Sequence, residues 1–156
     1  MPSIDARLNE LGLTLPPVAK PVASYIPVVV AEKAGLVFVS GQVPLKEGKP
    51  LALGTVPGDV SIEQAQACAR QCVLNGLAAV KAEIGSLDRI KRVVKVGVFV
   101  SCEKGFTEQP KVGNGASELL VAIFGEAGKH ARAAVGVPAL PLGVPVEVDL
   151  VLSLES

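Results

Sequence analysis

Apolar residues alternate with polar or small ones in several short stretches of the chain, a pattern that is typical of β-strands. Residues 24–32 and 35–45 form two such runs with a short break between them, and together they predict a β-hairpin. Residues 89–102 carry the strongest strand pattern, and two more strands are expected near 131–137 and 145–154. A turn rich in proline and glycine joins the last two strands.

The clearest helix is predicted over residues 61–84. Ser61 and Gln64 have the spacing of a capping box at its start, and Gly85 is a natural C-terminal stop. Its apolar residues recur at helical spacing and are expected to form one buried face: Ile62, Ala65, Ala69, Cys72, Val73, Leu77, Val80 and Ile84. A helix of this length needs a broad apolar partner, which we expect to be a sheet.

Two other helices are expected. One lies within residues 107–124 and ends near Gly125, but the Gly-Asn-Gly sequence at 113–115 leaves its start open. The other is short, lies within residues 3–12 and ends at Gly12. The predicted order of hairpin, helix, strand, helix, strand and strand indicates an α+β domain, in which two helices cover one face of a mixed sheet.

The alternation also predicts which side chains share a face of each strand. In the strand within 89–102, one face is expected to hold Val94, Val96, Val98 and Val100, and the other Val93, Lys95, Gly97 and Phe99. In the last strand, Val146, Val148, Leu150 and Leu152 suit the layer beneath the helices, whereas Glu147, Asp149 and Val151 face away. This second sheet face is too apolar to be left in water, and we expect other subunits to cover it.

Composition narrows the possible functions. The 156 residues suit one domain, and 15 basic and 15 acidic residues give zero net charge, which argues against a broad surface for nucleic acid or anionic membrane. Aromatic residues make up 3%, too few for base stacking, and no apolar run has the length of a membrane span. The start of the chain is polar and mixed in charge, so we expect no signal peptide and a cytoplasmic location.

Cysteine and histidine usage favours neither disulfides nor zinc. The three cysteines, Cys68, Cys72 and Cys102, fit no common zinc spacing, and His130 is the only histidine. We expect the cysteines to be small buried residues and predict no metal site.

Arg132 opens a long apolar run in which the next charged residue is Glu147. One interpretation is a structural ion pair between the two residues across adjacent strands. The other is that Arg132 is kept for a group outside the chain, because an unpaired charge on a covered face is costly unless something matches it.

Several segments resemble the Rid (reactive intermediate deaminase) family, also called YjgF-like and formerly labelled endoribonuclease L-PSP. They are FVSGQVP at 38–44, the helix at 61–84, VVKVGVFVS at 93–101 and ARAAVGVPALPLGVPVEVDL at 131–150. The resemblance runs in order over roughly residues 22–152 and leaves residues 1–20 as an N-terminal extension of a single domain spanning 1–156. It implies a chorismate-mutase-like α+β fold, assembled as a homotrimer with clefts between subunits.

The resemblance also implies a reaction. Family members with the arginine resemble enamine/imine deaminases, which hydrolyse 2-aminoacrylate and related imines to 2-oxo acids and ammonia without a metal or organic cofactor. Arg132 matches the arginine that binds the substrate carboxylate, and Glu147 the acid that positions or activates water. Tyr25 and Ser40 match residues that hydrogen-bond substrate or water, and Asn114 is the nearest candidate for an asparagine on the second helix. The implied ligand is a small imine or 2-oxo acid, and from the composition we expect no nucleic acid or membrane partner.

Alternatives remain open at several positions. Ala134 stands where the family often has cysteine, so any mechanism here must do without that thiol. Tyr25 is alternatively an ordinary surface residue, and Ser40 alternatively satisfies a turn. Besides hydrolysis of an imine, the sequence is compatible with a non-catalytic module that binds a small carboxylate. The third hypothesis is RNA cleavage, which the neutral charge, the scarcity of aromatics and the single histidine disfavour.

Overall fold

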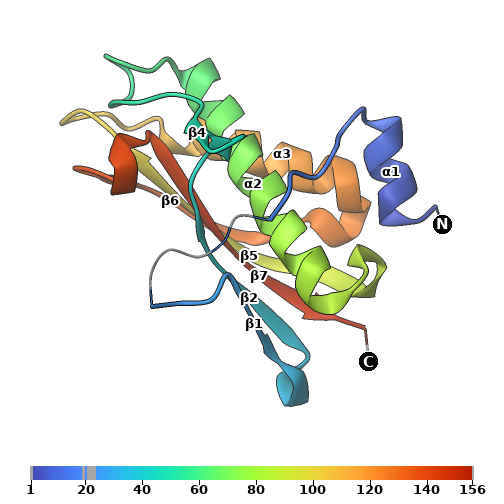
Figure 1. Ribbon diagram of the computed structural model, residues 1–156. Coiled ribbons are helices and arrows are strands. Elements are labelled where there is room, and N and C mark those ends of the chain that lie inside the picture. The colour runs from blue at the N-terminus through green and yellow to red at the C-terminus, as the bar shows by residue number, and fades with distance from the viewer. Residues whose placement is uncertain (1, 19, 21–23, 156) are drawn as a thin grey trace.

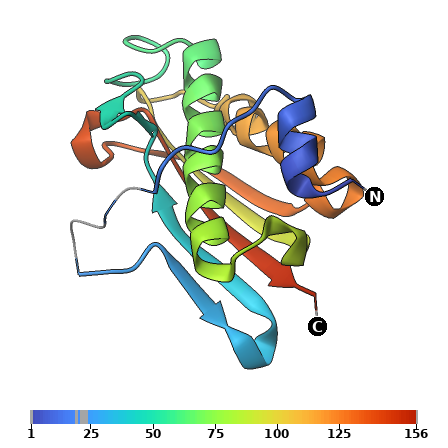
Figure 2. The same ribbon diagram turned by 45° about the vertical axis from the view of Figure 1, so that its right-hand side comes forward.

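The computed structural model describes residues 2–18, 20 and 24–155. Its main sheet has five strands in the order β1-β2-β7-β5-β6, with β5 and β6 parallel and the other neighbours antiparallel. The strands are β1 (Val28–Ala31), β2 (Leu36–Gln42), β5 (Ile90–Ser101), β6 (Ala131–Val137) and β7 (Val146–Leu154). Two helices, α2 (Ile62–Ile84) and α3 (Gln109–Phe124), cover one face of this sheet (Figures 1 and 2). The predicted two-layer α+β fold is confirmed.

The remaining elements are short. Strands β3 (Leu45–Lys46) and β4 (Lys49–Pro50) form a small separate ladder within the predicted loop. Helical turns of the 3₁₀ type lie at Glu32–Ala34, Leu87–Arg89, Gly125–Gly128 and Pro141–Gly143. The first of them makes the hairpin connection between β1 and β2.

Helix α2 forms where the sequence predicts it. The Ser61 hydroxyl accepts a hydrogen bond from the Gln64 amide at 3.1 Å, and the Gln64 side chain accepts one from the Ser61 amide at 2.9 Å. The helix ends at Gly85, whose φ of +86° favours glycine. All residues of the predicted apolar face except Ile62 are buried, so this face supplies the layer above β2 and β7.

The Gly-Asn-Gly sequence lies inside α3 and does not delay its start. Gly115 is required by close packing, because a Cβ there would overlap the backbone of Gln66 on α2, whose Cα would lie only 2.8 Å away. The glycine therefore allows α2 and α3 to approach closely. Its cost in helix propensity is offset by this contact between the helices.

Part of the face assignment for β5 is wrong. Val93 is fully buried under the helices, whereas Val94 is 37% exposed on the other side. The register of β5 against β7 shifts between Val93 and Lys95, where an extra residue forms a β-bulge. Strict alternation holds only beyond the bulge, where Val96, Val98 and Val100 are buried as predicted.

The N-terminal segment is anchored on the helical layer. Helix α1 (Ile4–Glu10) packs against α3, and the Arg7 side chain donates a hydrogen bond to the Ala122 carbonyl of α3 at 2.9 Å. Asp5 forms an ion pair with Lys81 of α2 at 2.8 Å, and Leu8 is buried. These contacts tie α1 to both long helices (Figure 1).

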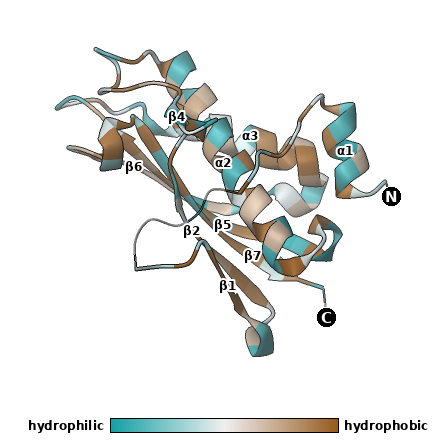
Figure 3. Cartoon of the chain, viewed as in Figure 1, coloured by the Kyte–Doolittle hydropathy of each residue, from teal (hydrophilic) through white to brown (hydrophobic). Residues whose placement is uncertain are grey.

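The second face of the sheet carries no helix in the part of the chain that the structure describes (Figures 1 and 2). Several of its apolar side chains are substantially exposed, including Val29 at 48%, Phe38 at 44% and Val135 at 45%. Hydrophobic colouring continues along these strands in Figure 3. We call this surface the open face. Among the described helices, none combines the length and apolar character that crossing a bilayer would require.

Candidate functional site

Arg132 lies on β6, the edge strand of the sheet, and faces the helical layer. Its neighbour in the β5–β6 ladder is Val96, which is buried beneath the helices. The guanidinium reaches α3, where Nη1 donates hydrogen bonds to Asn114 Oδ1 at 3.0 Å and to Ser117 Oγ at 3.1 Å. Nη2 donates to the Pro110 carbonyl at 3.3 Å. Three acceptors from one helix therefore hold the guanidinium.

Small residues make room for this arrangement. Gly113 lies on α3 directly against Arg132, and a Cβ there would be 3.1 Å from Nη1 and 3.4 Å from the Cβ of Ala134. Ala134 faces the same side of β6, two residues beyond the arginine. The small size of these two residues lets the guanidinium lie in the seam between α3 and β6.

Neutral acceptors satisfy the arginine only in part. A guanidinium has five N–H groups, and the acceptors on α3 use three of them, which leaves the Nε–H and one Nη2–H. Within the described chain, no carboxylate lies within ion-pairing distance of Arg132. The two remaining donors are the number that a bidentate carboxylate accepts. The arrangement is thus suited to an external anion.

The hydrogen bonds continue from Arg132 to His130. Ser117 Oγ lies 2.8 Å from His130 Nε2, and His130 Nδ1 lies 2.6 Å from the Gly128 carbonyl oxygen. Neither Ser117 nor His130 was among the predicted site residues. His130 precedes β6, so the alternation of side chains along that strand does not include it. The helical spacing from Asn114 to Ser117 was the available signal.

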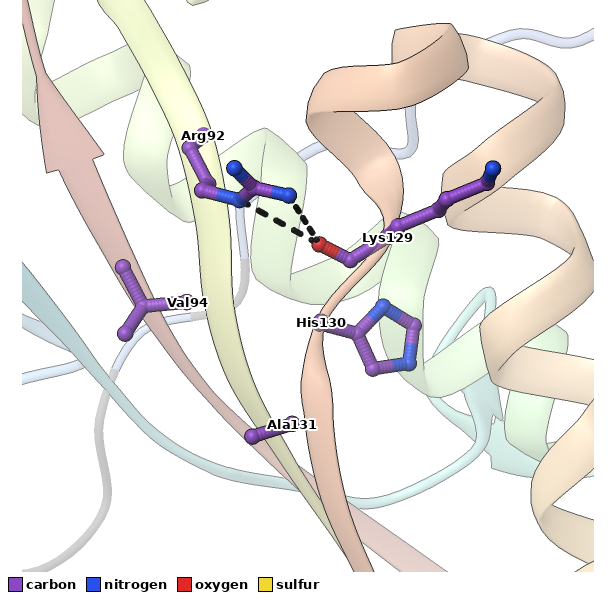
Figure 4. A pocket seen from close by; sticks show the side chains of 5 residues that line it. All are labelled: Arg92, Val94, Lys129, His130 and Ala131. Carbon is purple, nitrogen blue, oxygen red and sulfur yellow. Dashed lines mark hydrogen bonds between the residues drawn. The ribbon is translucent and has the colours of Figure 1, made fainter.

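A shallow pocket of about 410 Å³ borders His130 on its other side, lined also by Arg92, Val94, Lys129 and Ala131 (Figure 4). Its cations already have partners. Arg92 donates from Nε and Nη2 to the Lys129 carbonyl at 3.4 and 3.2 Å, and Lys129 pairs with Glu126 at 2.6 Å. The pocket does not include Arg132. Because the cations of the pocket are paired and Arg132 has two N–H donors left, we place the candidate site at the Arg132 guanidinium.

Glu147 lies on the open face of β7, opposite Phe99 of β5. Its carboxyl group rests against Gly41, where a Cβ would lie 2.9 Å from Glu147 Cδ and overlap the carboxyl oxygen. Burial, followed by the nearby charge of Asp149, raises the pKa of Glu147 above its usual value. No hydrogen bond or ion pair from another described side chain satisfies this carboxylate. It is therefore available to a water molecule or a substrate.

Ser40 and Tyr25 lie on the Glu147 side of the molecule. The register of β2 against β7 shifts between Val39 and Gln42, so Ser40 and Gly41 form an irregular step in the strand. Ser40 Oγ donates to the Ile26 carbonyl at 2.7 Å, which ties this step to the segment that carries Tyr25. Tyr25 is 50% exposed. This hydrogen bond is the kind of local stabilising contact that the alternative interpretation of Ser40 expects. The ligand-binding roles of Ser40 and Tyr25 stay predictions.

The predicted site residues form two groups in a single chain. Arg132 and Asn114 meet between β6 and α3, whereas Glu147 adjoins the Ser40–Gly41 step on the open face. Strand β5 lies between β6 and β7, and Arg132 and Glu147 point to opposite faces of the sheet. The ion pair considered for these two residues across adjacent strands is therefore wrong. Asn114, the candidate on the second helix, contacts Arg132 directly.

The cysteines do not form a metal site among the described residues. Cys68 and Cys72 are buried in α2, as predicted, whereas Cys102 is partly exposed. Burial raises the pKa of Cys68 to about 11 and holds that of Cys72 well above its ordinary value, so both thiols are neutral at physiological pH. Neither is suited to nucleophilic chemistry.

Comparisons with known proteins agree with the fold described above. Residues 5–154 match the model of a family described as "YjgF/chorismate_mutase-like, putative endoribonuclease". Protein TCP17 of Trypanosoma cruzi is 42% identical over 154 residues, which cover 98% of this chain and 95% of that protein. The crystal structure of Atu1372 from Agrobacterium tumefaciens matches with a TM-score of 0.89 and 43% identity, covering 97% of this chain and 92% of that one.

A crystal structure of a Shewanella oneidensis protein described as a "putative endoribonuclease" has a TM-score of 0.93 at 34% identity, covering 98% of this chain and 100% of that chain. The likeness thus extends over nearly the full length of both chains. It includes α1, which lies in the N-terminal extension. The chain belongs to the YjgF/chorismate-mutase-like family.

Proposed function

We propose that this protein is an enamine/imine deaminase, which hydrolyses 2-aminoacrylate-like intermediates to 2-oxo acids and ammonia in a cleft between two copies of the chain. The observation that carries the proposal is Arg132, a partly buried guanidinium that is held by neutral acceptors and keeps two N–H donors free. A small substrate with a carboxylate beside its reacting carbon matches those donors.

Arg132, which we call the anchor, defines the class of substrate. A guanidinium keeps its charge at any working pH and accepts a carboxylate in a planar, bidentate geometry. Its three bonds to Pro110, Asn114 and Ser117 restrict its motion before substrate arrives, which lowers the entropy lost on binding. We therefore assign the substrate carboxylate to Arg132, and the adjacent imine carbon to the space beyond it.

Glu147 is suited to act as the general base for the attacking water molecule. Its raised pKa reflects a carboxylate that is poorly solvated and lies near a second negative charge, and such a group is a stronger base than an exposed one. The enamine first takes a proton from solvent on its methylene carbon and becomes an iminium. Glu147 accepts a proton as water adds to the iminium carbon, and it then gives that proton to the amine nitrogen. The C–N bond breaks, ammonia leaves, and the remaining hydroxyl group releases its proton to solvent as the 2-oxo acid forms. No oxidant or reductant is needed for this step.

The separation of Arg132 and Glu147 calls for a second copy. In one chain they lie on opposite faces of the sheet, so one substrate reaches both only if the β6 edge of one copy meets the open face of another. The exposed Val29, Phe38 and Val135 supply the apolar area for such a contact. A head-to-tail contact of this kind can close into a ring, and we propose the homotrimer that the family resemblance implies.

The state of the three cysteines bears on the cellular location. All three cysteines are free, which is compatible with a reducing compartment, and we propose that the protein acts in the cytoplasm.

One observation favours a second candidate function. Ala134 contributes only a methyl group beside Arg132, so the chain lacks at that position the thiol that resembling proteins often carry. The alternative is a module that binds small carboxylates at Arg132 without hydrolysing imines. Binding and turnover must therefore be measured separately.

The test is a coupled assay. A pyridoxal-phosphate lyase generates 2-aminoacrylate from serine, semicarbazide competes for the imine, and the pyruvate that escapes trapping is measured. The wild type is expected to divert the imine to pyruvate and ammonia, and Arg132→Ala to lose this effect. A wild type that binds pyruvate through Arg132 but does not accelerate hydrolysis supports the binding module. Wild-type turnover in Arg132→Ala would overturn both assignments.

A further inference from the structure

A chain of hydrogen bonds behind Arg132 ends on a rigid backbone group. It runs from Arg132 Nη1 to Ser117 Oγ at 3.1 Å, from Ser117 Oγ to His130 Nε2 at 2.8 Å, and from His130 Nδ1 to the Gly128 carbonyl at 2.6 Å. Three parts of the fold meet here: α3, the turn at Gly125–Gly128 and the start of β6.

The two ends of this hydrogen-bond chain fix the direction of its outer bonds, and the direction of the middle bond follows when the imidazole carries a single proton. A carbonyl oxygen only accepts, so His130 Nδ1 carries the proton that it shares with Gly128. The Nε2 of the neutral ring then has a lone pair and accepts the Ser117 hydroxyl proton. The oxygen of Ser117 is left to accept from Arg132, which only donates. Each donor and acceptor in the chain has one partner that suits it.

The far end of the chain is firmly placed. Gly128 is buried, and a Cβ there would overlap the backbone of α3, with the Leu120 carbonyl carbon only 2.8 Å away. The Gly128 carbonyl therefore cannot shift without moving the end of α3. Figure 4 shows the His130 ring turned toward α3, where Ser117 lies, with Arg92 and Lys129 around the pocket beside it. These cations make no hydrogen bond to the ring that would compete with Ser117.

The hydrogen-bond chain acts on the Arg132 guanidinium through the second hydrogen of Nη1. Asn114 takes one Nη1 hydrogen and Ser117 the other, so the plane of the guanidinium is fixed by two acceptors on one nitrogen. Without Ser117 only the bonds to Asn114 and Pro110 remain, and they hold the guanidinium less tightly. The Nε–H and Nη2–H would then no longer point in one fixed direction. Ordering them when a bidentate carboxylate binds would cost free energy and lower the affinity.

We propose that Ser117 and His130 are positioning residues for substrate binding: His130 orients the Ser117 hydroxyl, and Ser117 holds the Arg132 guanidinium so that its Nε–Nη2 edge is presented to the substrate carboxylate. This inference rests on the proposed function, in which Arg132 is the anchor. It adds two residues that touch neither the substrate nor the reacting atoms. They define how the anchor is preorganised.

The kinetic test uses two removals and two conservative replacements. Ser117→Ala and His130→Phe break the chain, whereas Ser117→Thr keeps the hydroxyl and His130→Gln keeps an acceptor near the position of Nε2. In Ser117→Ala, KM for the imine and Kd for pyruvate are expected to rise about 3- to 10-fold, the range that one hydrogen bond corresponds to. His130→Phe is expected to have a smaller effect in the same direction. Ser117→Thr and His130→Gln should restore most of the affinity.

The kinetic signature separates positioning from general damage. We expect KM to change more than kcat, because a bond lost from the anchor weakens substrate and transition state alike. Glu118→Ala, an exposed neighbour on α3 outside the chain of hydrogen bonds, is the control and should leave KM and Kd unchanged. Thermal unfolding of each variant shows that the comparison is made between folded proteins.

A spectroscopic measurement does not depend on turnover. His130 is the only histidine, so the ¹⁵N signals of its ring in tag-free protein need no assignment. We expect the tautomer with the proton on Nδ1, and a shift of the Nε2 signal when pyruvate binds to the wild type that is absent in Ser117→Ala. A proton on Nε2 would contradict the direction of the chain and overturn the proposal.

The outcomes distinguish this inference from the function on which it rests. If Arg132→Ala loses both pyruvate binding and imine turnover while Ser117→Ala and His130→Phe keep wild-type KM and Kd, the positioning role is wrong and the proposed function stands. If Arg132→Ala itself binds and turns over like the wild type, both fail.

Discussion

Gly113→Ala should separate the stability of this protein from its ability to bind a carboxylate. Gly113 is an interior residue of α3, where alanine has a helix propensity that is better by about 0.8–1.0 kcal/mol. The added methyl group would lie 3.1 Å from Arg132 Nη1, 3.2 Å from its Cζ and 3.4 Å from the Cβ of Ala134. The same atom thus favours the helix and crowds the guanidinium.

The geometry sets the size of both effects. Ordinary carbon contacts begin at about 3.5 Å, so the guanidinium must retreat by roughly 0.4 Å. Its bonds to Asn114 and Ser117, now 3.0 and 3.1 Å, would lengthen toward the limit of a hydrogen bond. Losing the equivalent of one such bond raises Kd for a carboxylate about five-fold, or about 1 kcal/mol. The free energy of unfolding should be unchanged or up to about 1 kcal/mol higher.

Two measurements on one protein test this prediction. Urea unfolding gives the free energy of unfolding, and titration calorimetry with pyruvate gives Kd. The control is Glu118→Ala, an exposed substitution on the same helix. Wild-type affinity in Gly113→Ala would show that the bonds from α3 do not constrain the guanidinium. A loss of more than about 2 kcal/mol of stability would show that Arg132 cannot yield, contrary to the reasoning.

Three further predictions concern other positions. Gly115→Ala should lower the free energy of unfolding by about 1–3 kcal/mol in urea melts, because the new methyl group meets the Gln66 backbone, which cannot move aside; equal stability would refute this close packing. Gly41→Ala should displace the Glu147 carboxyl group and lower kcat by roughly 10- to 100-fold in the coupled assay, and an unchanged kcat would remove Glu147 from the reaction. Because burial and Asp149 raise the folded-state pKa of Glu147, ionisation of this group costs stability as the pH rises through that pKa. Glu147→Gln should therefore resist urea better than the wild type at pH 7, with a difference that shrinks as the pH falls through the raised pKa and is lost near the unfolded value of about 4.3, and a difference independent of pH would contradict the shift.

Local signals in the sequence were sufficient for most of the fold. The capping box at Ser61 and Gln64, the stop at Gly85 and the regular apolar spacing between them involve only neighbours in the chain, and α2 forms as they predict. The bulge between Val93 and Lys95 is different. It depends on how β5 pairs with β7, about sixty residues later, and an alternating pattern in one strand contains no trace of it.

The site divides in the same way. Arg132 and Glu147 stood out because each is charged within an apolar run, but their faces could not be compared before the strand order was known. Asn114 and Ser117 join Arg132 through the packing of α3 on an edge strand, a contact between residues that are 15 or more positions apart. His130 joins the same group through Ser117, which lies 13 positions earlier in the chain.

The most direct test of the central claim is complementation between two inactive variants. Arg132→Ala lacks the carboxylate anchor but keeps Glu147, and Glu147→Gln has the opposite defect. The two are unfolded together in equal amounts, refolded, and assayed for hydrolysis of 2-aminoacrylate beside each variant refolded alone. Light scattering should give a particle mass three times that of the 16.0 kDa chain.

If each site takes Arg132 from one copy and Glu147 from the next, random mixing restores a complete pair at about one site in four, so about a quarter of wild-type activity returns. Each variant refolded alone stays inactive. If the mixture remains as inactive as its components while refolded wild type recovers, the two residues do not meet across a subunit boundary, and the proposed site is wrong.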